Sequence, residues 1–324
     1  MIKKLVHVLS QMCHKSSNSL ETRLELKNKL DRFASENVTI VELLECLKVG
    51  QHRSIEFADG QIILSIQSSK TKYYWKSSDP RTAIACLAVI GEYETLETQV
   101  LKFFAKKATT IIDVGANVGY YVVELSQHLN PKGKLHAFEP VPDSFEQLTR
   151  NVELNNISSI INFNQVAVSN FEGSMRLYMP KTSGSSATSA RNLHPNEKVE
   201  KFDVKTTTLD SYAQTHQLAT LDLLKIDVEG AELMVIQGAL NSIEQFKPVI
   251  FAELLRKWSA QFEYHPNAVL NTLLPLGYRC YAVSDHLPEV HEITNDTVET
   301  NFVFIPTNRT SDLDSLLAEV RALK

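Results

Sequence analysis

The sequence predicts an α/β protein with a doubly wound, mostly parallel sheet that follows an N-terminal appendage of helices and a β-hairpin. Two observations lead to this prediction. From about Thr109 onward, apolar strand-like runs alternate with helical segments at the spacing typical of parallel sheets. Residues 1–80 lack this alternation. We therefore divide the chain into an appendage, residues 1–80, and a sheet domain, residues 81–324.

The appendage is expected to contain three helices and one hairpin. Apolar residues recur at helical spacing in residues 2–13 and 20–33, and a third helix, residues 39–50, ends at Gly50. The stretch SIEFADGQIILSIQ then suggests two short strands joined at Asp59-Gly60, a dipeptide that favours tight hairpin turns.

The sheet domain is expected to hold five parallel strands and a closing antiparallel pair. Helices are expected at residues 121–128, 142–155 and 231–246. The parallel strands are expected at residues 109–114, 134–139, 161–168, 221–228 and 248–254, and the closing pair at 277–283 and 301–306. Ligands of such sheets bind at the carboxyl ends of the strands, so we expect the site there.

The composition argues against several classes of partner. The net charge is −5 and Lys and Arg are dispersed, which disfavours nucleic acid. The chain has no apolar run long enough to span a membrane, and its beginning does not resemble a signal peptide. Four cysteines lie far apart, in neither a zinc nor a disulfide pattern: Cys13, Cys46, Cys86 and Cys280. We expect a cytoplasmic protein.

A first group of candidate site residues follows the strand at 109–114. In DVGANVG, Asp113, Gly115, Asn117 and Gly119 form the turn into the next helix. Gly115 allows the backbone to approach a ligand closely, and Gly119 allows the helix to pack on the sheet. Glu139 follows the second strand about 20 residues later, the separation typical of an acid that binds ribose hydroxyls. These residues predict a ribose-bearing cofactor.

The order D-x-G-x-N-x-G differs from the G-x-G-x-x-G pattern of dinucleotide turns, because Asn117 replaces a glycine that makes room for a pyrophosphate. Asp113 suits a cationic amino-acid head instead. S-adenosylmethionine has this head, a ribose and no phosphate, so it is the predicted cofactor. Three alternatives stay open: a plain strand-to-helix turn with a solvated Glu139, an NAD-dependent oxidoreductase, and a protein that binds the cofactor without catalysis.

A second group surrounds the end of the strand at 221–228. Lys225 and Asp227 share one face of this strand, and Glu229 and Glu232 follow. A buried strand rarely carries two charges unless they pair or act at its end. A purely structural role is the alternative for two of these residues. Lys225 could simply neutralise Asp227 or Glu229, and Glu232, in the first turn of the next helix, could simply complement the helix dipole. Asp227 and Glu229 are ligands that magnesium accepts, but two acids do not establish a metal site, and none is predicted.

These stretches resemble the FkbM family of S-adenosylmethionine-dependent methyltransferases. The matching segments are IIDVGANVGYY, HAFEPVPDSFEQLTRNVELN, VAVSN, TTTLDSYA and LLKIDVEGAELMVIQGA, in the family's order, with GEYETLET ahead of them. The resemblance covers residues 88–254 and leaves 1–80 unexplained. It implies the class I methyltransferase fold, a seven-stranded, Rossmann-like sheet, and O-methylation of a hydroxyl on a sugar, glycan or other natural-product metabolite.

The resemblance also implies roles for individual residues. Asp227 and Glu229 would face the reacting centre, with Asp227 the first candidate for the base, Glu229 the second and His265, which precedes a proline, a distant third. The implied cofactor contacts are Glu94, Asp113, Gly115, Asn117, Gly119, Glu139, Ala167 within 164–167 near the adenine, and Asp227.

Residues 182–201 form a Ser-rich stretch that interrupts the strand pattern. We expect a mobile flap over the acceptor, with Ser185, Ser186 or Arg191 in contact with it, and plain disorder is the alternative. The expected partner is a small-molecule or glycan acceptor. A nucleic-acid methyltransferase is disfavoured because the chain lacks the N-P-P-Y loop typical of amino-group methylation.

Overall fold

The computed structural model describes residues 53–58, 61–75, 82–89, 91–181 and 187–322. Two compact units make up the chain, Met1–Thr95 with Glu153–Asn155, and Leu96–Val152 with Asn156–Lys324. The three helices expected within residues 1–50 lie outside the described residues, and the domain boundary after residue 80 stays a prediction.

The first unit contains the expected hairpin. β1 (Arg53–Ala58) pairs antiparallel with β2 (Gln61–Ile66), and Ala58 lies opposite Gln61. The predicted turn at Asp59-Gly60 lies outside the described residues. A third strand that the sequence did not suggest, β3 (Thr71–Trp75), pairs with β2 and is followed by α4 (Ala83–Val89). Leu64 and Tyr73 face each other across this pair, and burial of both side chains stabilises the added strand.

The second unit is built on a seven-stranded sheet in the order β12-β13-β11-β10-β4-β5-β6. Strands from β11 to β6 run parallel, and β13 runs antiparallel to both β11 and β12. This confirms the doubly wound, mostly parallel, Rossmann-like sheet. The strands are β4 (Thr110–Val114), β5 (Lys134–Phe138), β6 (Ile161–Asn164), β10 (Leu223–Ile226), β11 (Val249–Glu253), β12 (Tyr278–Ala282) and β13 (Asn301–Pro306).

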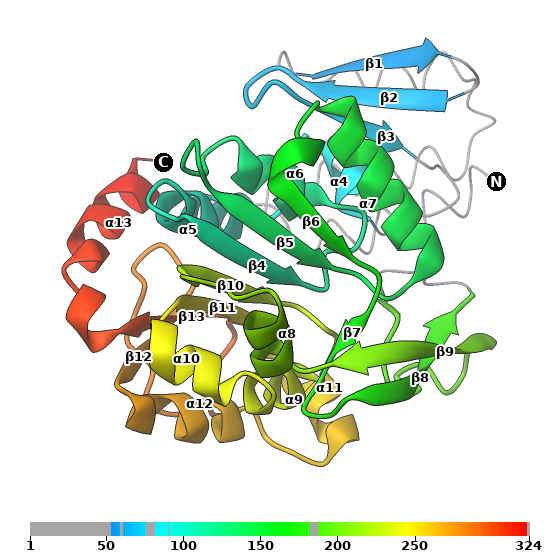
Figure 1. Cartoon of the computed structure of the whole chain (residues 1–324). Helices are drawn as coiled ribbons and strands as arrows, with labels where there is room; N and C mark the ends of the chain where they lie inside the picture. Colours follow the sequence, from blue (N-terminus) through cyan, green and yellow to red (C-terminus); the bar gives the residue numbers. More distant parts are fainter. Residues whose placement is uncertain (1–52, 59–60, 76–81, 90, 182–186, 323–324) are drawn as a thin grey trace. The chain divides into compact units, whose positions relative to one another are not determined.

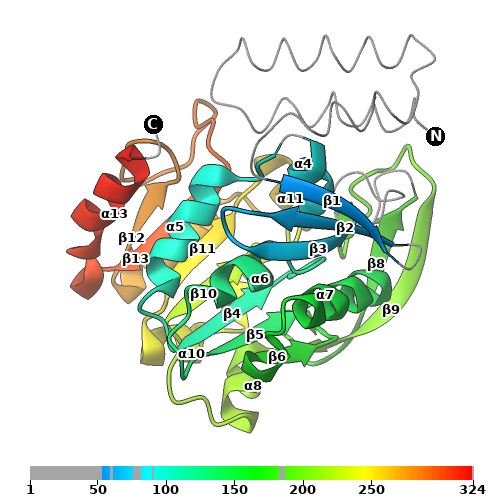
Figure 2. The ribbon, with the colours of Figure 1, turned by 90° about the horizontal axis from the view of Figure 1, so that it is seen from above.

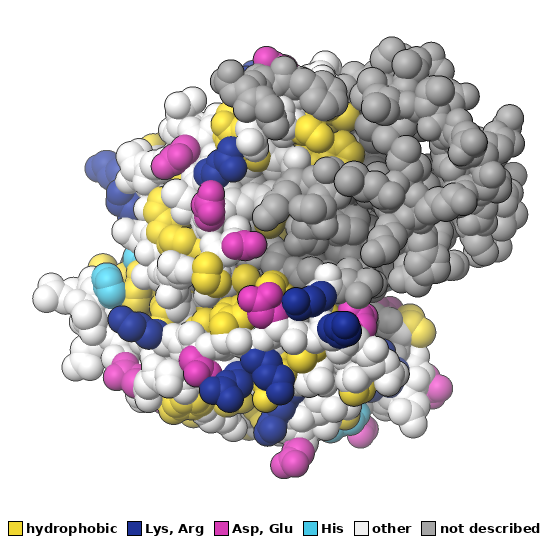
Figure 3. All heavy atoms as spheres, turned by 90° about the vertical axis from the view of Figure 1, so that its right-hand side faces the viewer, with side chains coloured by type: hydrophobic (Ala, Val, Ile, Leu, Met, Phe, Trp, Pro, Cys, Tyr) yellow, Lys and Arg dark blue, Asp and Glu magenta, His cyan; other side chains and the backbone are white. Residues whose placement is uncertain are grey.

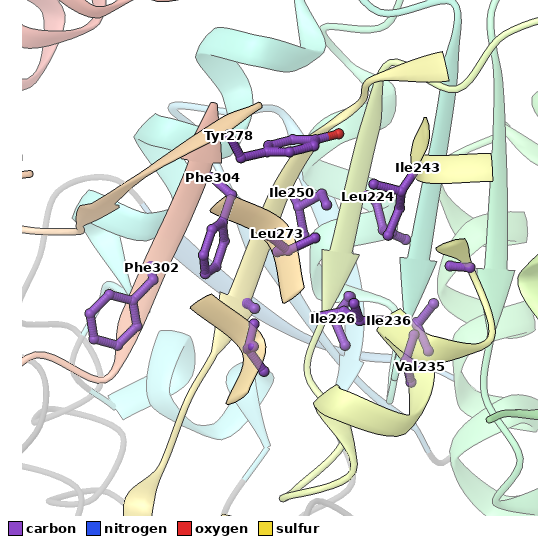
Figure 4. Close-up of a cluster of buried hydrophobic side chains, with 14 of the residues drawn as sticks. Leu224, Ile226, Val235, Ile236, Ile243, Ile250, Leu273, Tyr278, Phe302 and Phe304 are labelled. Carbon is purple, nitrogen blue, oxygen red and sulfur yellow. The ribbon is translucent and has the colours of Figure 1, made fainter. Parts of the chain in front are cut away.

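Helices cover both faces of this sheet. α5 (Thr95–Ala105), α6 (Tyr120–Ser126) and α7 (Pro142–Leu154) lie side by side on one face (Figures 1 and 2). The other face carries α8 (Leu209–Thr215), α9 (Glu232–Gln237), α10 (Leu240–Phe246) and α12 (Asn267–Leu273). Apolar side chains of the strands and of α9, α10 and α12 meet there in one core (Figure 4). Such covering explains why β4 and β10 are buried along their whole length.

Two expected elements are divided. The strand predicted at 161–168 becomes β6 and β7 (Ala167–Val168), and β7 joins a separate sheet with β8 (Gly173–Pro180) and β9 (Val199–Thr207). Residues 199–201 of the predicted flap therefore belong to a strand. The helix predicted at 231–246 is interrupted at Gly238, where a Cβ would lie 2.0 Å from the Ser169 carbonyl oxygen. Close backbone packing thus requires glycine and ends α9.

In the part of the chain that the structure describes, every helix is too short or too polar to cross a membrane.

Candidate functional site

The loop after β4 is shaped by two glycines with left-handed backbone. Gly115 and Gly119 have φ values of 83° and 85°. A Cβ on Gly115 would lie 1.9 Å from the Asp227 carbonyl oxygen, and one on Gly119 would lie 2.6 Å from Leu148 of α7. Both glycines therefore allow close packing within the protein. The loops after β4 and β10 touch at Gly115, as the topological switch point between these strands requires.

Glu139, directly after β5, joins this loop. One carboxylate oxygen accepts a hydrogen bond of 2.8 Å from the backbone N–H of Asn117, and the other accepts one of 2.8 Å from the N–H of Val141. Asn117 has a φ of 48°, an uncommon value for a residue other than glycine. Burial raises the pKa of Glu139 to about 7, although both hydrogen bonds oppose the shift. Glu139 thus fixes the DVGANVG loop after β4.

A buried ion pair lies between β4 and β10. Lys225 is opposite Asp113 in the parallel register, and its ammonium lies 3.2 Å from the Asp113 carboxylate and 3.5 Å from that of Asp227. Asp113 and Lys225 are almost wholly buried, whereas the Asp227 side chain is 31% exposed. Burial raises the pKa of Asp113, and Lys225 counteracts this rise. Asp227 is therefore the more exposed of the two acids that Lys225 contacts.

Two buried acceptors at this edge lack a donor among the described residues. They are Asp113 Oδ2 and Asn117 Oδ1. Unsatisfied buried polar atoms are uncommon and costly, so they indicate a strained or ligand-binding position. The N–H donors of a ligand, such as those of an ammonium, are the kind of group that such acceptors bind. The residues at this edge therefore fit a ligand with a cationic amino-acid head, although Lys225 already offsets part of the Asp113 charge.

The turn after β10 is held in a left-handed conformation. Glu229 and Gly230 have φ values of 51° and 100°. Glu232 Oε1 accepts hydrogen bonds from the N–H groups of Gly230, at 2.9 Å, and Val228, at 3.3 Å. The Tyr264 hydroxyl lies 2.9 Å from the Gly230 carbonyl oxygen and 3.0 Å from Glu232 Oε2. Burial raises the pKa of Glu232 to about 7. Glu232 thus holds the turn that carries Glu229.

The remaining candidates lie in different places. Ala167 is buried and packs with Val141, two residues beyond Glu139. Glu94 belongs to the first unit, with a φ of 42°. His265 is exposed and accepts a hydrogen bond from the Asn267 N–H at the start of α12, which suits a helix-initiating residue. Ser185 and Ser186 lie outside the described residues, whereas Arg191 is described and exposed.

Among the described residues, no cluster of three or more His, Cys, Asp and Glu side chains suits a metal ion. The prediction of no metal is not tested by this finding.

The sequence reasoning missed three aromatic residues near the Glu229 turn. Tyr264 contacts Gly230 and Glu232 directly. A Cβ on Gly230 would lie 2.8 Å from the Phe262 ring and 3.0 Å from the Trp258 carbonyl oxygen. Their position in the sequence could have identified them as site candidates. All three follow β11, at the carboxyl edge of the sheet, in the stretch RKWSAQFEY.

Several known proteins are similar to this chain. Residues 113–280 match the family model described as the methyltransferase FkbM domain. Over 159 residues the chain is 31% identical to methyltransferase sdnD of Sordaria araneosa, a match that covers 40% of this chain and 59% of that protein. Over 151 residues it is 27% identical to the hexuronic acid methyltransferase AglP of Haloferax volcanii, covering 45% and 56%. The chain spans little more than half the length of these relatives.

Among solved structures, the chain is similar to methyltransferase FkbM of Methylobacillus flagellatus KT, with 15% identity and a TM-score of 0.40 over 68% of this chain and 52% of that one.

Proposed function

The chain belongs to the methyltransferase FkbM family, and from that premise we propose that it transfers a methyl group from S-adenosylmethionine to an oxygen of a sugar or other natural-product acceptor. The observation that carries this proposal is the meeting of three loops at one edge of the sheet. Glu139, the DVGANVG loop and Asp227 come from three neighbouring strands, and direct contacts join them.

We assign each residue at this edge to a different part of the cofactor. Asp113 Oδ2 and Asn117 Oδ1, which have no donor among the described residues, would accept hydrogen bonds from the ammonium of the methionine end. Glu139 would bind the ribose, because each of its oxygens has a second lone pair beside the one that a backbone N–H occupies. Ala167, in one apolar cluster with Val141, would border the adenine.

When bound, the cofactor supplies an activated methyl group on a sulfonium. The protein then has to align the acceptor oxygen and remove its proton. Asp227 is the proposed base because its carboxylate is partly exposed, while the buried Lys225 ammonium holds it at 3.5 Å. Glu229, in the adjoining turn, is the second candidate and would orient the acceptor hydroxyl.

A hydroxyl-bearing sugar is the acceptor that we favour. Its support is the relative AglP, a hexuronic acid methyltransferase, in which the recognised substrate is a sugar acid. The acceptor would approach the exposed side of Asp227, next to residues 187–194, which lie against the Glu229 turn through a hydrogen bond of 2.8 Å from Ser189 Oγ to the Glu229 carbonyl oxygen.

Methyl transfer to a panel of glycans and hydroxylated metabolites, followed by mass spectrometry, tests this function. We expect the parent protein to methylate at least one acceptor when S-adenosylmethionine is present. The Asp227→Asn variant should not methylate this acceptor. If S-adenosylmethionine stays bound but no acceptor in a broad panel of hydroxyl compounds is methylated, the O-methyltransferase proposal is contradicted.

A further inference from the structure

The segment that carries β8 and β9 is basic, although the whole chain is acidic. Residues 173–207 contain six Lys and Arg against three Asp and Glu, whereas the full chain has a net charge of −5. On the described part of the face that carries β8 and β9 at the right of Figure 1, Lys and Arg side chains lie in the lower half, interspersed with Asp, Glu and hydrophobic side chains (Figure 3). The cationic excess therefore belongs to the segment, and individual Lys and Arg side chains without an acidic partner can attract anionic ligands.

Arg191 lies in this segment and stacks on an aromatic ring. Its guanidinium carbon is 5.9 Å from the centroid of the Phe262 ring. Its backbone N–H also donates to Ser189 Oγ at 3.4 Å. The side chain is exposed, and no described carboxylate forms an ion pair with it. The ring therefore orients a cation whose charge remains available to a ligand.

A second cation is held in the same manner. The Lys257 ammonium lies 4.5 Å from the centroid of the Trp258 ring, and the His194 ring lies 5.4 Å from it. Lys257 is exposed, and it also has no carboxylate partner among the residues that the structure describes. The two aromatic residues thus hold two cations and one histidine at the edge of the sheet.

This cluster adjoins the turn that carries Glu229. The Phe262 ring and the Trp258 carbonyl lie so close to Gly230 that a side chain there would collide with both. Ser189, two residues before Arg191, donates to the carbonyl oxygen of Glu229. Phe262 and Ser189 therefore place Arg191 near the turn that carries Glu229.

We propose that Arg191, assisted by Lys257, binds a carboxylate of the acceptor, so that the protein methylates a sugar acid in preference to the corresponding neutral sugar. This inference rests on the proposed function. The carboxylates of Asp227 and Glu229 repel an anionic acceptor, and the cations over Phe262 and Trp258 offset that repulsion. An arginine fork also matches a planar carboxylate in two parallel hydrogen bonds, which a neutral hydroxymethyl group does not provide.

A binding experiment with S-adenosylhomocysteine-saturated protein tests this inference. Methyl glucuronide and methyl glucoside differ only in the carboxylate, and each is titrated into the same saturated protein. We expect methyl glucuronide to bind about tenfold more tightly or better, because a charge-assisted pair is lost in the glucoside. Arg191→Met is expected to remove this preference, and Arg191→Lys to retain part of it, since the charge remains but the fork is lost.

Controls separate this inference from the proposed function. Lys257→Met should reduce the preference by less than Arg191→Met, and Arg321→Met, at the exposed end of α13 (Asp312–Arg321), should leave it unchanged. Equal binding of the two sugars, no binding of either, or an unchanged preference in Arg191→Met overturns the carboxylate subsite. Failure to bind S-adenosylhomocysteine at the start overturns the proposed function instead.

Discussion

The carboxylate of Glu139 accepts a hydrogen bond of 2.8 Å from the backbone N–H of Asn117. This contact joins the end of β5 to the loop after β4, across two neighbouring parallel strands. It also fixes a residue with positive φ, a conformation that needs support from its surroundings. Glu139 therefore shapes the loop after β4, in addition to the ribose contact that we propose for it.

Replacement of Glu139 by alanine should weaken binding of S-adenosylhomocysteine about tenfold or more, because the ribose contact and the anchor of the Asn117 loop are both removed. Calorimetric titration measures the dissociation constant. Glu146→Ala, an exposed position on α7, serves as the control and should leave the constant unchanged. An unaltered constant in Glu139→Ala would refute the ribose assignment.

The pH dependence of stability should reveal the buried glutamates. Burial raises the pKa of Glu139 and of Glu232 from 4.5 to about 7. The folded state then binds protons more tightly than the unfolded chain, so the free energy of unfolding falls as the pH rises through this window. The contribution is complete below pH 4.5 and lost above pH 7. Its size is up to about 3 kcal/mol for one group.

Urea unfolding at several pH values between 4.5 and 8 checks this prediction. Glu232→Gln should show a smaller fall in stability across the window than the parent protein, since the amide does not titrate. Exposed Glu146→Gln is the matched control and should follow the parent. Parallel curves for the parent and Glu232→Gln would contradict the assignment.

Gly115→Ala should disrupt the DVGANVG loop after β4. The new Cβ would lie 1.9 Å from the Asp227 carbonyl oxygen at a φ of 83°. Gly277→Ala is a matched control, because Gly277 has the same φ of 83° but its nearest neighbour would lie 3.7 Å away. We expect both variants to lose about 1 kcal/mol or more of stability from backbone strain. Only Gly115→Ala should lose binding of S-adenosylhomocysteine, and equal binding by both would exclude the close contact.

Asp227→Asn should lower the turnover of an acceptor about 100-fold or more, because the amide cannot take up the proton. Binding of S-adenosylhomocysteine should change little, since Asn retains the shape of the side chain. Glu229→Gln should have a smaller effect on turnover. The comparison requires steady-state rates of methyl transfer for both variants, and unchanged turnover in Asp227→Asn would remove this residue from the role of base.

Tyr264→Phe should loosen the turn that carries Glu229. The hydroxyl lies 2.9 Å from the Gly230 carbonyl oxygen, and its loss should cost about 1 kcal/mol of stability. Turnover should fall while binding of S-adenosylhomocysteine stays constant. Tyr278→Phe is the control, because the Tyr278 hydroxyl is buried without a hydrogen-bond partner among the described residues. Equal turnover in the two variants would leave Tyr264 with no role in positioning.

The sequence predicted the sheet because its signals are local. The alternation of apolar strands with helices predicted the five parallel strands and the closing pair. The candidate site residues Asp113, Glu139 and Asp227 lie where expected, at the carboxyl edge of the sheet. The spacing of apolar residues is sufficient to predict the strands and helices. The position of a residue at a strand end is sufficient to predict the site, because the carboxyl ends of parallel strands lie together.

Long-range contacts were not predictable in the same way. Glu232 was interpreted as a possible complement to the helix dipole, but it holds the Glu229 turn together with Tyr264, 32 residues later in the chain. Likewise, the sequence did not indicate that Gly115 packs against the backbone of Asp227. Such pairings depend on which loops the fold brings together, and a single sequence does not state them.

Titration calorimetry of the parent protein with S-adenosylmethionine and, separately, with NAD tests the central claim most directly. We predict a dissociation constant for S-adenosylmethionine on the order of micromolar, equivalent to about −8 kcal/mol, and no measurable heat with NAD at the same concentrations. Micromolar binding of NAD without binding of S-adenosylmethionine would contradict the account and favour an oxidoreductase.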